Sequence, residues 1–257
     1  MITVGIDVGF ENTKVIILQD GKIVGRGKGE SGGIGRNAAA ERILKEALDD
    51  AGLDGADIGR IAATGKGKVS IEFADDRITE VLSSFQAARF LYPEAGALVD
   101  TGADETLAMT YNDARVIEMV INQKCSAGLG SFLSYMGRRL ELTPEEMCSL
   151  DRPSGEAALN EGCVVFAELD ALGLLNRGVL PREVASLLTD AAAVRASSVI
   201  VDLTLPVTGP CILVGGLAKN VAFVNALKLH SGLDFLIHEE AEYAGAIGAA
   251  LFAAVPA

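Results

Sequence analysis

Short apolar runs alternate along the chain with segments of helical hydrophobic spacing, and this alternation predicts an α/β protein. In the first third we expect strands over 1–9, 13–19, 22–27 and 61–65, and helices over 38–51 and 78–91. Asp20-Gly21 is a hairpin signal between the second and third strands. The glycine-rich run over 25–36 is expected to form a mobile surface loop.

The same pattern restarts near residue 96, where strand, turn, strand, hairpin and strand follow one another to residue 121. Asp7-Val8-Gly9 then falls on Asp100-Thr101-Gly102, and Asp20-Gly21 falls beside Asn112-Asp113. An internal repeat of this kind predicts duplicated β-meander-plus-helix subdomains. We place the first over 1–94 and the second over 95–257, with the option that the last helix packs back on the first subdomain.

The rest of the chain is expected to be mainly helical. Helices are predicted over 131–140, 164–176 and 181–203, and a closing helix of small residues over 244–255. A strand over 211–214 is expected to lead into a Gly-Gly turn and a helix starting near Ala218, and a short strand is expected over 235–239.

Composition and charge narrow the function classes. The 257 residues carry a net charge of −13, which disfavours binding to nucleic acid or to an anionic membrane through the whole surface. An apolar stretch over 191–205 is broken by Arg195 and Asp202, so we expect no membrane span. The N-terminus has no basic segment of a signal peptide, and we expect a cytoplasmic protein.

The two Asp-x-Gly turns are candidate phosphate loops. A single turn of this type is commonly structural, but two at matching places in duplicated meanders favour a pair of loops around one nucleotide. Gly9 and Gly102 allow the backbone to approach phosphates, and Asp7 and Asp100 would hold Mg²⁺ through water. The Gly-Gly turn over 214–220 would lie against a purine ring. Neither a P-loop nor a dinucleotide-binding fingerprint is present.

Four cysteines are present, without a Cys-x-x-Cys pair. Free cysteines are commonly small buried hydrophobes, and we interpret Cys148 and Cys211 in this way. Cys125 and Cys163 each precede a predicted helix and have small neighbours, which favours thiolate and an anionic cluster. Two thiols cannot complete a four-cysteine site, but a dimer whose two-fold axis passes through the cluster can.

The segments GIDVGFENTK, VDTGADE, QKCSAGLGSFL, GCVVFAELD, VGGLAKN and YAGAIGAAL resemble, in order, signatures of the activator ATPases of 2-hydroxyacyl-CoA dehydratases and the related ATP-binding subunits of benzoyl-CoA reductase. The resemblance covers essentially the whole chain. It implies the actin-like ATPase fold of the sugar-kinase and Hsp70 superfamily, which is ribonuclease H-like. It also implies ATP or ADP with Mg²⁺, and one [4Fe–4S] cluster per dimer, held by Cys125 and Cys163 of each subunit.

The resemblance further implies a homodimer, or a pseudo-homodimer with a similar subunit, that uses ATP to push a low-potential electron into a partner enzyme acting on an acyl-CoA. The implied catalytic residues are Asp7, Asp100 and Asp104. The implied nucleotide-binding residues are Gly9, Asn12, Thr13, Lys14, Gly102, Ala103, Gly128, Gly130, Gly215, Gly216, Lys219 and Asn220.

This sequence departs from the activator pattern at both phosphate turns. Phe10 and Glu11 stand where small hydroxyl residues are usual, and Asp104 stands in place of a glutamine. Two alternatives therefore stay open beside the redox ATPase. One is a non-redox small-molecule kinase of the same superfamily, with Asp104 as catalytic carboxylate. The other is a cluster-bearing relay or assembly subunit that binds nucleotide poorly.

Overall fold

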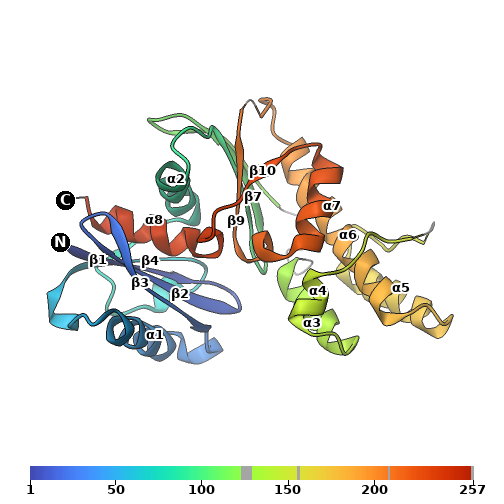
Figure 1. Cartoon of the computed structure of the whole chain (residues 1–257), viewed down its shortest axis with the longest axis horizontal. Helices are drawn as coiled ribbons and strands as arrows, with labels where there is room; N and C mark the ends of the chain where they lie inside the picture. The colour runs from blue at the N-terminus through green and yellow to red at the C-terminus, as the bar shows by residue number, and fades with distance from the viewer. Residues whose placement is uncertain (123–128, 155–156, 208, 256–257) are drawn as a thin grey trace. The chain divides into compact units, whose positions relative to one another are not determined.

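The computed structural model describes residues 1–122, 129–154, 157–207 and 209–255 (Figure 1). Its contacts divide the chain into two compact units. Unit 1 comprises Met1–Glu94 and Tyr243–Ala257, and unit 2 comprises Ala95–Glu242. The chain thus returns to unit 1 for its last helix, α8 (Ala244–Ala253).

Unit 1 is built on a five-stranded sheet in the order β3-β2-β1-β4-β5. The first three strands form an antiparallel meander, and β4 and β5 run parallel to β1. Asp20 and Gly21 both have positive φ at the β2–β3 turn, which is the backbone that the hairpin signal predicts. The elements before the chain crosses to unit 2 are β1 (Ile2–Val8), β2 (Asn12–Gln19), β3 (Lys22–Glu30), α1 (Arg36–Ala51), β4 (Ile58–Thr64), β5 (Asp76–Arg77) and α2 (Glu80–Leu91).

The glycine-rich run over 25–36 is a strand for half its length, so the prediction of a mobile loop was wrong. Gly25, Gly27 and Gly29 lie at alternate positions of β3 and leave room for α1 to pack closely on this face. A Cβ at Gly27 would lie 2.8 Å from Cγ2 of Ile43 and 2.9 Å from its carbonyl oxygen. Glycine is required here by a close approach between layers rather than by a turn.

Helix α8 packs against β1 and β4 of the sheet, and α2 packs on α8 (Figure 1). The contact depends on small residues, because a Cβ at Gly5 would overlap the backbone of Ala246 and Ala250. Similarly, a Cβ at Gly248 would overlap the carbonyl group of Ser83 in α2. The apolar closing segment of the sequence is therefore an internal helix of unit 1.

Replacing Gly248 by alanine should destabilise unit 1 by about 2 kcal/mol, because the added methyl group forces α8 away from α2. Thermal unfolding of the purified protein measures the effect. Gly173→Ala, also within a helix, is the matched control, since a Cβ there meets no atom within 4 Å among the described residues. Alanine at that position should leave stability unchanged or raise it. A lower melting temperature in the control than in Gly248→Ala would contradict the packing argument.

Unit 2 repeats the topology of unit 1. Its sheet has the order β10-β9-β6-β7-β8, with an antiparallel β6-β7-β8 meander and with β9 and β10 parallel to β6. The predicted duplication of a β-meander is therefore confirmed. The strands of this sheet are β6 (Ala97–Thr101), β7 (Thr106–Tyr111), β8 (Val116–Ile121), β9 (Cys211–Val214) and β10 (Phe235–Leu236).

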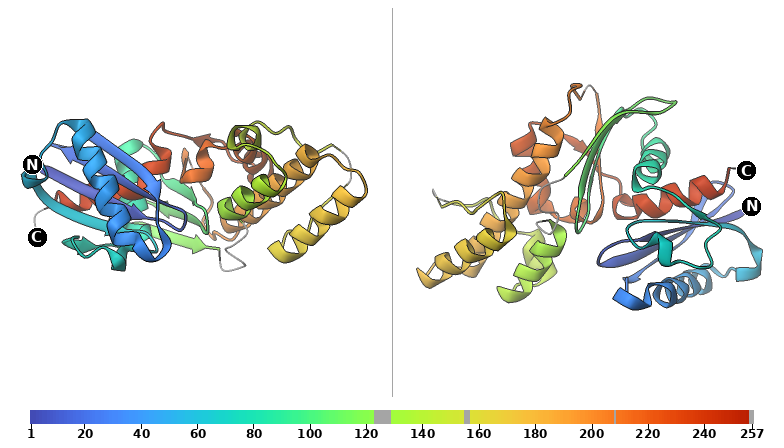
Figure 2. Two further views of the ribbon diagram at one scale, coloured as in Figure 1. Left: turned by 90° about the horizontal axis from the view of Figure 1, so that it is seen from below. Right: turned by 180° about the vertical axis from the view of Figure 1, so that it is seen from behind.

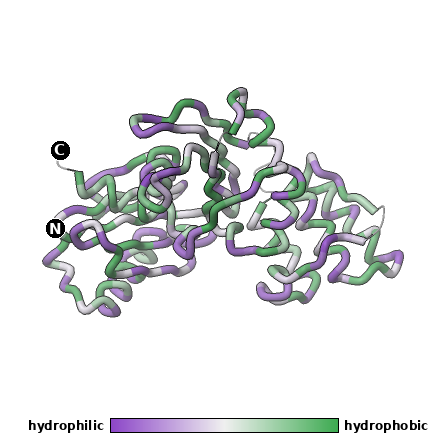
Figure 3. The backbone as a smooth tube through the Cα atoms, turned by 45° about the horizontal axis from the view of Figure 1, so that its top comes forward, coloured by the Kyte–Doolittle hydropathy of each residue, from purple (hydrophilic) through white to green (hydrophobic). Residues whose placement is uncertain are grey.

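The long helix α6 of unit 2 packs against α3, α5, α7 and the sheet, and α4 packs on α3 and α7 (Figure 2). These helices are α3 (Gly130–Arg139), α4 (Pro144–Cys148), α5 (Val164–Asn176), α6 (Pro181–Val201) and α7 (Val221–Ser231). By length and composition α6 could cross a membrane, but 78% of its most apolar window is buried within the protein. Figure 3 shows hydrophobic and hydrophilic residues interleaved along the chain.

The Gly-Gly turn leads into a short 3-10 helix, Gly216–Lys219, and α7 begins only at Val221. The prediction of a helix from near Ala218 was therefore early by three residues. The reason is a cap: the side chain of Asn220 accepts the backbone N–H of Phe223 at 2.9 Å and so fixes the start of α7.

Candidate functional site

The first Asp-x-Gly turn lies at the end of β1. The Gly9 N–H donates to the Asn12 carbonyl at 3.1 Å, and this bond closes the turn. Ser31, at the end of β3, donates its hydroxyl to the Gly9 carbonyl at 2.9 Å and contacts the Thr13 hydroxyl at 3.1 Å. The Ser31 N–H also donates to the Glu11 carbonyl at 2.9 Å. Phe10, which is 56% exposed, thus lies on a turn whose backbone is held by hydrogen bonds from Ser31.

Asp7 is enclosed by unit 1 on several sides. Lys14 lies opposite it on β2, with its ammonium nitrogen 3.7 Å from the carboxylate. A Cβ at Gly65 would lie 2.5 Å from Oδ1 of Asp7, and a Cβ at Gly245 would lie 2.9 Å from Oδ2. Burial raises the pKa of Asp7 above its usual 3.8, the Lys14 charge opposes this, and Glu80 adds to it. The Asp7 carboxylate is partly buried and keeps an exposed edge, through which it can hold a hydrated divalent metal.

The second turn is closed by the equivalent backbone hydrogen bond, 93 positions later. The Gly102 N–H donates to the Glu105 carbonyl at 3.0 Å, as Gly9 does to Asn12. Asp100 is the penultimate residue of β6 as Asp7 is of β1, and Thr101 donates its hydroxyl to the Val214 carbonyl at 3.3 Å. The two Asp-x-Gly turns therefore match in backbone geometry as well as in sequence, and their backbone atoms are those that would face a phosphate.

The duplication also includes a glycine that follows the strand parallel to each meander. Gly65 follows β4 with φ of +85°, and Gly215 follows β9 with φ of +91°. A Cβ at Gly215 would lie 2.6 Å from Oδ1 of Asp100, just as one at Gly65 would meet Asp7. Gly215 was predicted from the sequence, whereas Gly65, Gly245 and Ser31 were not. The Ala-Thr-Gly end of the strand over 61–65 was the available signal for Gly65.

Helix α3 begins directly on the second turn. The Gly130 N–H donates to the Gly102 carbonyl at 3.4 Å, and Ser131 donates both its N–H and its hydroxyl to the Ala103 carbonyl, each at 2.8 Å. A Cβ at Gly130 would lie 3.0 Å from the Gly102 carbonyl oxygen. Three of the predicted site residues, Gly102, Ala103 and Gly130, are thus in contact. Ser131 was not predicted, and Gly128 lies outside the described residues.

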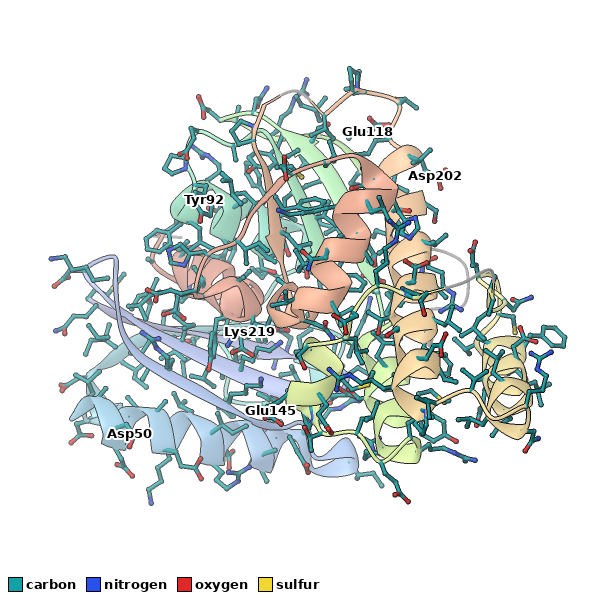
Figure 4. All side chains as sticks on the ribbon, turned by 45° about the vertical axis from the view of Figure 1, so that its right-hand side comes forward. Asp50, Tyr92, Glu118, Glu145, Asp202 and Lys219 are labelled. Carbon is teal, nitrogen blue, oxygen red and sulfur yellow. The ribbon has the colours of Figure 1, made fainter. Side chains whose placement is uncertain are left out.

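The predicted purine-binding segment occupies the turn before α7. Gly215 donates its N–H to the Ala241 carbonyl at 2.9 Å, and Gly216 opens the 3-10 helix. The Lys219 ammonium, labelled in Figure 4, pairs with the buried carboxylate of Glu242. The Asn220 amide nitrogen donates to the Met147 carbonyl at 3.2 Å. Lys219 and Asn220 therefore fix the turn. A Cβ at Gly216 would meet no atom within 4 Å among the described residues, whereas Gly215 lies against Thr101 and Asp100.

Cys163 stands in the N-cap position of α5 and is partly exposed. The side-chain oxygen of Asn160 accepts the N–H groups of Gly162 at 3.0 Å and of Cys163 at 2.8 Å. The thiol itself makes no capping hydrogen bond within the described part of the chain. An accessible thiol at the positive end of a helix is a favourable ligand for an anionic iron–sulfur cluster.

The other described cysteines differ from Cys163 in their surroundings. Cys211 is 1% exposed in β9, and burial raises the pKa of its thiol to about 12. The pKa of Cys148 is also raised, first by burial and then by Glu145. Cys125 lies outside the described residues. Among the described residues, no group of three or more His, Cys, Asp and Glu side chains could hold a metal ion.

The first turns of α5 carry an exposed apolar face directly after Cys163. Val165, Phe166 and Leu169 are each more than half exposed, and Leu172 continues the face one turn later. Most apolar residues of an ordinary surface are scattered, whereas a continuous apolar face commonly marks an interface.

Comparisons with known proteins agree with this geometry. Residues 4–253 match the model of the BadF/BadG/BcrA/BcrD ATPase family. The chain is 33% identical to the activator of lactoyl-CoA dehydratase from Anaerotignum propionicum, over 98% of this chain and 97% of that protein.

Two solved structures also match, each with a TM-score of 0.89. Component A of the (R)-2-hydroxyglutaryl-CoA dehydratase of Acidaminococcus fermentans is 28% identical, with 98% of this chain and 97% of that one covered. The activator of the 2-hydroxyisocaproyl-CoA dehydratase from Clostridium difficile, with bound ADPNP, is 27% identical, with 98% and 94% covered. The predicted actin-like α/β fold is confirmed by these structures.

Proposed function

Because the chain belongs to the BadF/BadG/BcrA/BcrD ATPase family, we propose that it is the ATP-dependent activator of a 2-hydroxyacyl-CoA dehydratase or of a benzoyl-CoA reductase type of enzyme. It carries a [4Fe–4S] cluster between two copies of itself and delivers low-potential electrons to that partner. The observation that carries the proposal is the pair of matching Asp-x-Gly turns, one of which supports the helix that follows Cys125.

Each of the two turns serves as a phosphate loop. Gly9 and Gly102 bring backbone N–H groups close to phosphate oxygens, and Asp7 and Asp100 hold hydrated Mg²⁺. Lys14, beside Asp7, compensates part of the negative charge that accumulates there. Asp104 lies on the second turn, where its carboxylate can orient the attacking water. The turn that bears Phe10 and Glu11 is closed by the same backbone hydrogen bond as the second turn, from Gly9 N–H to the Asn12 carbonyl, which supports a phosphate loop at both places.

Cys163 and Cys125 of each subunit complete the four thiolate ligands of the cluster across a two-fold axis. When bound there, the cluster would supply electron transfer at a potential set by charge, hydrogen bonds and solvent access around it. The exposed apolar face of α5 supports the dimer, because a second copy would bury Val165, Phe166 and Leu169 beside the cluster. Cys163, the proposed ligand in the described part of the chain, thus fits the group that the family implies, since it is partly exposed at the N-cap of a helix.

Nucleotide and cluster are linked by α3. Its first residues hold the Gly102 and Ala103 carbonyls of the second turn, and Cys125 precedes the same helix by five residues. A change in the second turn on ATP hydrolysis therefore acts on the N-terminus of α3. The segment before α3 carries the proposed cluster ligand Cys125. ATP can drive electron transfer only if the protein has two conformations that differ in their relative affinity for ATP and ADP.

An anaerobic iron determination combined with an ATPase assay tests the proposed function. We expect about four iron atoms per dimer after reconstitution, brown protein, and Mg²⁺-dependent ATP hydrolysis. A colourless, active protein would instead indicate a kinase of the same superfamily. A brown, inactive protein that fails to bind ATP would indicate a relay subunit.

The link through α3 predicts a specific defect in Ser131→Ala. In the wild type we expect ATP and ADP to give different rates of iron loss to a chelator from the reduced protein. Removing the hydroxyl deletes one of the two hydrogen bonds to the Ala103 carbonyl, which is worth about 1 kcal/mol. The ratio of the two rates should therefore move several-fold toward one.

Ser134→Ala is the matched control, because Ser134 is an exposed residue of the same helix. It should keep the wild-type ratio. Equal rates with ATP and ADP in the wild type, despite binding of both nucleotides, would contradict the coupling. An unchanged ratio in Ser131→Ala would show that this hydrogen bond does not transmit it.

A further inference from the structure

A buried arginine lies behind the loop that presents Cys163. Arg195 is in the middle of α6 and is 8% exposed. Its guanidinium donates from Nη2 to the Asn160 carbonyl at 2.9 Å and from Nε to the Glu161 carbonyl. One cationic side chain therefore holds two successive peptide groups, and these end two residues before the cluster ligand.

The loop is fixed from other directions as well. The Asn160 N–H donates to Oδ2 of Asp170 on α5 at 2.9 Å, while the Asn160 side chain accepts the N–H groups of Gly162 and Cys163. Leu159, the residue before, is buried in the core of unit 2. Asn160 thus joins Arg195 on one side to the backbone of Cys163 on the other.

Burying a guanidinium costs free energy, which hydrogen bonds to carbonyls recover only in part. Arg195 is the charged residue among the buried side chains of α6, most of which are apolar. The planar guanidinium has a geometric advantage over an ammonium, because its donors are rigidly spaced and can hold two acceptors at once. The arrangement therefore favours precise placement of the loop over stability of the core.

We propose that Arg195, acting through Asn160, is a positioning residue that holds Cys163 in the conformation that binds the cluster. The inference rests on the proposed function, since it concerns a ligand of that cluster. It adds that the ligand is held from inside unit 2 by a cation. A positive charge behind a thiolate-ligated, anionic cluster also favours its reduced form.

Two substitutions separate the charge from the geometry. Arg195→Lys keeps the positive charge but cannot reach both carbonyls with the same spacing, and Arg195→Met removes charge and donors together. Arg182→Met is the control. Arg182 is an exposed residue of the same helix that donates to the Ser149 carbonyl at 2.8 Å, away from the Cys163 loop.

The first measurement uses full-length protein without the cluster. Amide hydrogen exchange over residues 160–163 should accelerate by about tenfold in Arg195→Met and to a smaller degree in Arg195→Lys. The second measurement uses reconstituted protein. Iron content should fall in both variants, and any cluster that remains in Arg195→Met should have a lower midpoint potential than in Arg195→Lys. Arg182→Met should match the wild type in all three readouts.

Asn160→Ala keeps the experiment decisive if Arg195→Met fails to fold, because Asn160 is exposed and its loss leaves the core intact. It should loosen the same amides and lower the iron content. Wild-type exchange and iron content in both Asn160→Ala and Arg195→Lys would overturn the proposal. If the wild type itself takes up no iron, the proposed function fails, and the exchange experiment still decides whether Arg195 holds the loop.

Discussion

Replacing Asp100 by asparagine should lower the rate of ATP hydrolysis by at least about 100-fold, because a charged partner of the metal is lost where charge develops in the transition state. Asp7→Asn should have an effect of similar size, since the two carboxylates hold equivalent places at the ends of β1 and β6. Phosphate release under excess Mg²⁺ and the affinity for Mg-ATP measure both effects. Unchanged turnover and affinity in both variants would contradict the proposed nucleotide site.

The melting temperature of Asp7→Asn distinguishes a loss of turnover at the site from misfolding of the variant. Burial raises the pKa of this carboxyl above 3.8, so ionisation is less favourable in the folded than in the unfolded protein. The stability contributed by the protonated form is present below pH 3.8 and is lost as the pH rises through the raised value. At neutral pH asparagine avoids this cost. Nucleotide-free Asp7→Asn should therefore melt no lower than the wild type while losing turnover.

The parts of the fold around the candidate site that the sequence predicted are those specified by local signals. The Asp-x-Gly turns, the hairpin at Asp20-Gly21 and the strand leading to Gly215 each occupy a few consecutive residues, and the structure places them as expected. The duplication was detectable because both meanders use the same turns at the same spacing. Helix α5 was predicted with its observed bounds, since its apolar spacing is continuous from Val164 to Asn176.

The parts that the sequence argument missed depend on residues far apart in the chain. Asp7 is enclosed by Gly65 and Gly245, and no local pattern relates these three positions. The glycines of β3 resemble a loop because the strand is specified by its pairing with β2 and by the approach of α1. In the sequence Arg195 only interrupts an apolar run. Its hydrogen bond to the Asn160 carbonyl joins two segments far apart in the chain and is seen only in the structure.

The prediction with the largest effect concerns the cluster. Cys163→Ser should abolish iron binding in reconstituted protein and remove the absorbance near 400 nm. Serine keeps the size of the side chain, but its hydroxyl does not provide the thiolate that iron requires. Each subunit contributes the same residue, so one substitution removes two of four ligands and also the bridge between subunits. The dimer should therefore dissociate at concentrations where the wild type stays associated.

Two other cysteines serve as controls for general damage to the protein. Cys148→Ser and Cys211→Ala should keep the iron, because Cys211 is buried in β9 and Cys148 ends a short helix packed near α7. Cys211→Ala is expected to lower stability by about 1 kcal/mol through the lost volume. Iron that persists in Cys163→Ser but disappears in Cys148→Ser would reassign the ligand. Loss in both Cys163→Ser and Cys125→Ser, with an intact fold, is what a cluster shared by two copies of one chain requires.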